Sequence, residues 1–138
     1  MKRVKLFAVV VLACLSMISC NNENNENNEK PNYAGTYSGT MSMTGVEKSI
    51  NTKLIFINWG DNLTLYGAQL MKTSETTYTA KSDLLKAAIV LIAPDAIDQQ
   101  IENLDAKFTF SGNQVTMYLT YNLMGIAEVK VITFNGTK

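Results

Sequence analysis

Strict alternation of apolar and polar residues is the feature that most constrains how this chain can fold. From Tyr33 to Thr44, Tyr, Gly and Met take every second position, and Ala, Ser and Thr lie between them. The same period of two returns from Gln114 to Leu123. Successive side chains of a β-strand point to opposite faces, so this pattern predicts strands with one buried and one solvated face.

Shorter segments with strand character fill much of the remaining domain. A dense turn signal at Asn58–Asn62 separates two of them and predicts a hairpin. Turns at Ser111–Asn113 and Gly125 divide the end of the chain into a three-strand meander. The further predicted strands are Ile50–Asn58, Leu63–Met71, Ala106–Phe110 and Ile126–Asn135, with Thr76–Ala80 as a candidate for a short additional one.

The period changes around residues 82–104, which predicts a helical insertion in the sheet. Ser82 followed by Asp83 is typical of a helix N-terminus, and the apolar run Leu84–Ala93 predicts a helix. Because this run is apolar nearly all round, a buried strand remains an alternative. Asp95–Leu104 predicts a second, amphipathic helix, since its apolar residues recur at spacings of three and four. The acidic residues of that segment are interpreted as a solvated face.

These elements together predict a mainly β, β-rich α+β fold: an antiparallel meander of six to seven strands that forms a barrel or half-barrel. Gly35 and Gly39 predict sharp bending or a close approach of two backbones in the first strand. Packed side chains are expected to fill the interior, and a cavity for a small apolar molecule is the alternative. The interior is expected to be lined by Met41, Met43, Phe56, Phe108, Met117 and Leu119.

The N-terminus carries the pattern of a secretory leader. Basic residues precede the apolar run Leu6–Ile18, which ends in Ser19-Cys20. The run is too short to span a bilayer as a stable helix, so residues 1–19 are predicted to be a cleaved signal peptide. The sequence before Cys20 resembles the bacterial lipobox, and this resemblance implies that Cys20 is lipidated and anchors the protein to a membrane. A plain secretory leader is the alternative.

An Asn/Glu-rich segment follows Cys20 and almost lacks apolar side chains. Such a segment cannot offset the entropy cost of ordering, so residues 20–32 are expected to be a disordered tether. Residues 33–138 are expected to form a single β-rich domain, since that length suffices for one hydrophobic core.

The composition excludes many kinds of catalytic and metal site. The chain has no histidine, and its two cysteines, Cys14 and Cys20, lie in the leader and at the expected lipidation position. Histidine-based catalysis and the common zinc and copper sites are therefore impossible. We expect a protein that is not an enzyme and has no catalytic residue, metal site or cofactor. After the leader, nine basic residues oppose twelve acidic ones, which argues against nucleic-acid binding.

The segment YAGTYSGTMSM, followed by a hairpin with Gly-Asp-Asn at its tip, resembles small Bacteroidetes-type lipoproteins with a lipocalin-like (calycin-like) β-barrel domain, a family of unknown function. The resemblance covers the leader, the tether and the first part of the domain. It implies a barrel fold and a location in the bacterial cell envelope, as an outer membrane lipoprotein on either the surface or the periplasmic face. It implies no site residue.

Three aromatic residues are the candidates for ligand contact. Trp59 lies at a predicted hairpin tip, where a large apolar ring has no evident structural role, and Tyr66 and Tyr118 could join it in a platform. The sequence therefore predicts a lipid-anchored envelope module that binds a glycan or a protein. A lipocalin-like carrier of a small apolar molecule and a purely structural envelope protein are the alternatives.

Overall fold

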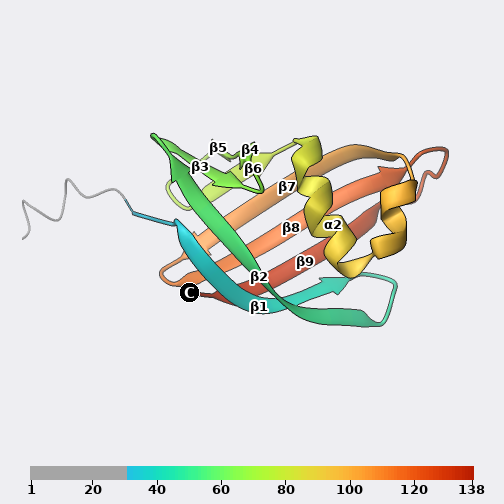
Figure 1. The fold of residues 1–138 in the computed structure, drawn as a ribbon, viewed down its shortest axis with the longest axis horizontal. Coiled ribbons are helices and arrows are strands. Elements are labelled where there is room, and N and C mark those ends of the chain that lie inside the picture. The colour runs from blue at the N-terminus through green and yellow to red at the C-terminus, as the bar shows by residue number, and fades with distance from the viewer. Residues whose placement is uncertain (1–30) are drawn as a thin grey trace, which may run out of the picture. The chain divides into compact units, whose positions relative to one another are not determined.

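The computed structural model describes residues 31–138, and within it Tyr33–Lys138 form one compact unit (Figure 1). The predicted signal peptide, Cys20 and most of the predicted tether lie outside the described residues. The elements, in chain order, are β1 (Gly35–Met43), β2 (Lys48–Trp59), β3 (Asn62–Leu65), β4 (Ala68–Gln69), β5 (Met71–Lys72), β6 (Thr77–Ala80), a 3₁₀ turn η1 (Asp83–Leu85), α2 (Lys86–Ile92), a 3₁₀ turn η2 (Pro94–Asp98), β7 (Ile101–Ser111), β8 (Gln114–Leu123) and β9 (Lys130–Thr137).

All the strands belong to one antiparallel sheet whose order is β4-β3-β2-β1-β9-β8-β7-β6-β5. The two edge strands, β4 and β5, follow each other along the chain with only Leu70 between them. The segment Ala68–Lys72 therefore pairs with β3 through its first half and with β6 through its second half. The sheet curls into a nearly closed barrel, as predicted, although it has nine strands rather than six or seven.

The strand count differs because the predicted strand Leu63–Met71 is interrupted. Tyr66 and Gly67 both adopt positive φ, at 52° and 80°, and form a tight turn between β3 and β4. Two central residues with positive φ are typical of a type I′ hairpin turn. The first of these two residues is usually Asn or Gly, and the second is usually Gly. A tyrosine in the first position gave no turn signal, so the turn could not be seen in the sequence. The final strand is also shorter than predicted and begins at Lys130.

The helical insertion is confirmed in its first half and wrong in its second. Ser82 caps η1 by accepting a hydrogen bond from the Leu84 amide at 3.2 Å, and α2 follows, so the predicted run Leu84–Ala93 is helical as far as Ile92. No second helix covers Asp95–Leu104: η2 ends at Asp98, and β7 starts at Ile101.

A β-bulge explains why this segment resembled a helix. Ile101 and Leu104 are both buried, three residues apart, because the register shifts between Glu102 and Asp105. Asn103 lies in this bulge with a φ of 53°. After it, the ordinary alternation of a strand resumes. The extra residue of a bulge thus produced the spacing of three that a helix would also give.

Helix α2 covers a part of the barrel wall where strands lack neighbours. β3 pairs with only the last four residues of β2, and β6 with only four residues of β7. Figure 1 shows α2 between the remaining halves of β2 and β7. It turns Ala88, Ile89 and Ile92 into the core, where each is fully buried. The insertion therefore completes the hydrophobic enclosure that the short strands leave open.

Buried aromatic and aliphatic side chains form one hydrophobic cluster in the interior. Five of the six residues expected to line it are buried, and Met43 packs against the core from its margin. A cluster of aromatic rings occupies one end of the barrel, with edge-to-face and stacked contacts at centroid distances between 4.4 and 6.0 Å. Aromatic pairs of this kind add to the stability that burial gives. The rings are Tyr33, Tyr37, Phe56, Tyr78, Phe108 and Phe110.

The backbones of β1 and β9 approach each other closely at Gly39, which is one of the two outcomes that this glycine predicted. Gly39 pairs with Gly136, and a Cβ atom on Gly39 would lie 1.9 Å from the Asn135 carbonyl oxygen and 2.5 Å from the Gly136 Cα. No side chain other than hydrogen can therefore occupy this position without moving the strands apart.

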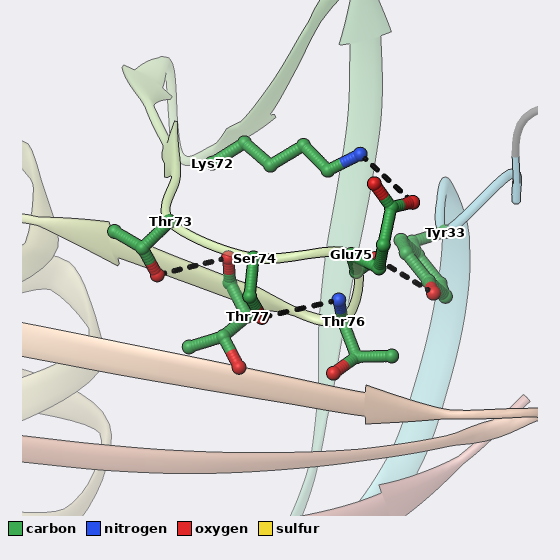
Figure 2. A network of polar contacts seen from close by, with 7 residues as sticks. All are labelled: Tyr33, Lys72, Thr73, Ser74, Glu75, Thr76 and Thr77. Atoms are coloured by element: carbon green, nitrogen blue, oxygen red, sulfur yellow. Dashed lines mark hydrogen bonds and ion pairs between the residues drawn. The ribbon is translucent and has the colours of Figure 1, made fainter.

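Polar contacts hold the loop between β5 and β6 against the place where the chain enters the domain (Figure 2). The Tyr33 hydroxyl donates to the Glu75 carbonyl oxygen at 3.2 Å, and the Thr73 hydroxyl donates to the Thr77 carbonyl at 3.2 Å. Lys72 and Glu75 form an exposed ion pair at 3.3 Å, whose contribution to stability is small. The loop is thus ordered mainly by hydrogen bonds to backbone carbonyls.

Candidate functional site

Trp59 lies on the outer face of β2 at its last position, next to the predicted hairpin turn. Its side chain is 79% exposed. Ile55 and Ile57 precede it on the same face and are also exposed, so three apolar side chains follow one another along the outer face of β2. An indole exposed to this extent contributes little to the core, which leaves its ring available to a ligand.

A groove of about 300 Å³ lies beside the indole on the outer face of β2, β3 and β4. Register places Asn62 opposite Trp59 and Gln69 opposite Thr64. The Thr64 hydroxyl donates to the Ile57 carbonyl at 3.0 Å. The side-chain amides of Asn62 and Gln69 make no hydrogen bond within residues 31–138. The residues that line the groove are Trp59, Asn62, Thr64, Gly67 and Gln69.

This arrangement combines an aromatic face with unused amide donors and acceptors and contains no charged side chain. Each amide offers two N–H donors and a carbonyl oxygen with two lone pairs. The groove can therefore hold an uncharged ligand that has both an apolar face and several hydroxyl groups. The sequence suggested Trp59 as a candidate but gave no sign of Asn62 or Gln69, since only the register of β2, β3 and β4 brings them beside it.

Tyr66 lies in the β3–β4 turn that bounds this groove, directly before Gly67, although it is not among the lining residues. Its φ of 52° is nearly equal to that of Asn103, at 53°. Asn tolerates this left-handed conformation, whereas a bulky residue is strained in it. Burial raises the pKa of the Tyr66 hydroxyl above its ordinary value. Strained residues often lie beside binding sites.

Tyr118 lies elsewhere on the barrel. It is half-exposed on the outer face of β8, between Lys107 of β7 and Thr133 of β9. Two strands, β9 and β1, separate β8 from β2. The structure therefore brings Tyr66 near the Trp59 groove but does not bring Tyr118 there, and the three rings do not form one platform.

Acidic residues do not gather in a metal site in the described part of the chain. Asp95 and Asp98 lie in η2, whereas Glu102 belongs to β7. Within residues 31–138 there is no group of three or more His, Cys, Asp or Glu residues placed to hold a metal ion. No helix among these residues is long and apolar enough to cross a membrane.

Comparison with known proteins gives little information about a family. No family model matches the chain, and no curated protein matches it. A solved structure from Bacteroides fragilis, described as a "putative outer membrane protein", is similar at 12% identity with a TM-score of 0.46. The match covers 77% of this chain and 51% of that one, so this chain spans about half the length of its structural neighbour. At this TM-score the likeness indicates neither a shared family nor a shared function.

Proposed function

We propose that this protein is a non-enzymatic binding module of the bacterial cell envelope, anchored by a lipid on Cys20, and that it binds a saccharide in the Trp59 groove. The observation that carries the proposal is the exposed indole beside the amide side chains of Asn62 and Gln69, which make no hydrogen bond within residues 31–138. A sugar ring presents an apolar C–H face and a rim of hydroxyls, which match the indole and the amides. The proposed location in the cell envelope is supported by the leader, the lipobox-like sequence before Cys20 and the resemblance to lipocalin-like lipoproteins.

The single tryptophan of the chain makes the test direct, because intrinsic fluorescence at its emission wavelength reports only on Trp59. We expect maltohexaose, cellohexaose or another neutral oligosaccharide to shift or quench this emission in a saturable way. The Gln69→Ala variant should weaken binding by about 2- to 10-fold, the usual loss for one neutral hydrogen bond. Gln99→Ala, an exposed glutamine outside the groove, is the matched control and should bind as the wild type does.

Trp59→Ala should weaken binding by about 30-fold or more, as expected for an aromatic hot spot, and is measured by calorimetry because the reporter is lost. The proposal is wrong if no saccharide in a broad glycan array binds the wild type. It is also wrong if Gln69→Ala and Trp59→Ala both bind as tightly as the wild type does.

The carrier of a small apolar molecule is a weaker candidate, because buried aromatic and aliphatic side chains pack together as one cluster in the barrel interior. Native mass spectrometry separates the two functions. A mass adduct of a few hundred daltons that disappears on denaturation would favour the carrier.

A further inference from the structure

A row of alternating hydroxyl and amide side chains crosses four neighbouring strands on the outer face of the barrel. Register pairs Thr116 of β8 with Asn135 of β9, Asn135 with Thr40 of β1, and Thr40 with Asn51 of β2. All four side chains are exposed. Three steps between neighbouring strands make the row about 14 Å long.

Hydrogen bonds orient this row in two repeats. The Thr116 hydroxyl donates to Asn135 Oδ1 at 3.2 Å, and the Thr40 hydroxyl donates to Asn51 Oδ1 at 3.2 Å. In each pair the asparagine oxygen is engaged, so its two amide N–H groups remain as donors, and the threonine oxygen remains as an acceptor. The row therefore presents donors and acceptors in a repeating order, held in place before any ligand arrives.

Two adjoining grooves follow the row on either side of β1. One has a volume of about 360 Å³ and lies over β8, β9 and β1, and the other has a volume of about 390 Å³ and lies over β1 and β2. They share Ser38, Gly39 and Thr40, so they meet at the first strand. Their lining is hydroxyl, amide and backbone, with Lys53 as its one charged side chain and no carboxylate. Such a lining fits an uncharged ligand rich in hydroxyl groups.

Tyr118 supplies an aromatic ring beside this row. It lies two residues after Thr116 on the same face of β8, about 7 Å along the strand, and its side chain is 50% exposed. The Tyr118 ring, which lies away from the Trp59 groove, is thus at one end of the hydroxyl and amide row. An aromatic face next to ordered polar groups is the same combination that Trp59, Asn62 and Gln69 provide.

We propose that this row, with Tyr118 at its side, is a second saccharide-binding site. Its ligand class rests on the proposed function of the Trp59 groove. Asn51 and Trp59 are eight residues apart on β2, about 26 Å along the strand, so the two sites are separate. A polysaccharide chain long enough to reach both would bind more tightly than either site alone allows, through its raised effective concentration.

The test is a titration of the ¹⁵N-labelled protein with maltohexaose and cellohexaose, with glucose as the single-ring control, followed by amide NMR shifts. The Trp59→Ala variant isolates the second site. We expect the hexasaccharide that binds the wild type still to shift the amides of Thr40, Asn51, Thr116 and Asn135 in this variant. Thr40→Val should then weaken the remaining binding several-fold, whereas Thr36→Val, an exposed threonine on the same face of β1 outside the grooves, should not.

The outcomes separate the two proposals. If the wild type binds but Trp59→Ala shows no shift at the row at saturating ligand, the second site is wrong and the Trp59 groove stands. Equal effects of Thr40→Val and Thr36→Val would also overturn it. A wild type that binds no saccharide overturns the proposed function itself and this site with it.

Discussion

The two sides of the barrel are built very differently. β7, β8, β9, β1 and β2 have 8 to 12 residues each and pair along most of their lengths. β3, β4, β5 and β6 have only 2 to 4 residues each and depend on loops, turns and α2 to complete their part of the wall. Long ladders hold a rigid row of side chains in register, whereas short strands leave room for a turn-bounded groove. The hydroxyl and amide row lies on the long strands, and the Trp59 groove lies where the end of β2 meets the short strands β3 and β4.

The largest effect is expected where the two sides meet. Phe110 of β7 stacks on Tyr33 at 4.4 Å and contacts Tyr78 of β6 at 5.7 Å, so it joins the long strands to the short ones. Phe110→Ala should lower the free energy of unfolding by about 3–5 kcal/mol. Urea denaturation measures it, with the exposed Leu91→Ala as a control that should cost less than about 1 kcal/mol. If Phe110→Ala lowered the free energy of unfolding no more than the control does, Phe110 would not be what joins the long strands to the short ones.

A smaller effect is expected from a change within the long-strand side alone. Gly39→Ala places a methyl group against the β9 backbone and should cost about 3 kcal/mol. Gly45→Ala is the matched control: its φ is 82°, but a Cβ atom there meets nothing within 4 Å. That variant should cost only about 1 kcal/mol, from backbone strain. Equal losses in the urea midpoint would show that the close approach of β1 and β9 is not tight.

Alkaline pH should lower the free energy of unfolding through two tyrosines on the long-strand side. Burial raises the pKa of Tyr37 in β1 and of Tyr121 in β8, and Tyr33 nearby raises that of Tyr37 further. The unfolded chain therefore releases these protons first, so stability is fully present below about pH 10 and is lost as the pH rises above it. Urea midpoints measured between pH 8 and pH 11 should fall at the upper end. A Tyr37→Phe, Tyr121→Phe double variant should flatten this fall, and a profile as steep as that of the wild type would exclude these tyrosines.

The smallest effect on stability is expected at the turn on the short-strand side. Tyr66→Asn removes left-handed strain of about 1 kcal/mol and loses ring burial of similar size, so stability should change by less than about 1 kcal/mol. Asn103→Tyr, the reverse change at the same φ, should cost at least about 1 kcal/mol. Thermal unfolding of both variants checks this. A loss above about 2 kcal/mol for Tyr66→Asn would mean that packing of the ring outweighs the strain.

The sequence predicted most of the long strands well, apart from the starts of β7 and β9, and it also predicted the helical insertion. Alternation identified β1 and β8, and Ser82 marked the start of the helical insertion. On the short-strand side, Tyr66 concealed a turn because tyrosine is unusual in that conformation, and at the start of β7 the bulge at Asn103 imitated a helical spacing. Local patterns report on local structure, and neither feature has a local signal.

The candidate sites show the same limit. The exposure of Trp59 followed from its place at a hairpin tip, which is a local property. The separation of Tyr118 from Trp59, and the row that runs from Thr116 to Asn51, depend on the pairing of β1 with β9. That pairing joins residues from opposite ends of the domain, and no short sequence pattern predicts it.

The same pairing has a consequence for the time course of folding. Ser38 and Thr137 are partners although almost the whole domain separates them. β1 is made first, and one of its edges stays without a partner until the last strand has been synthesised. Contacts between distant parts of a chain form slowly, because loop closure costs entropy before the contact is gained. The barrel therefore cannot close while its C-terminus is still missing, and a chain truncated before β9 would expose the β1 edge to other chains.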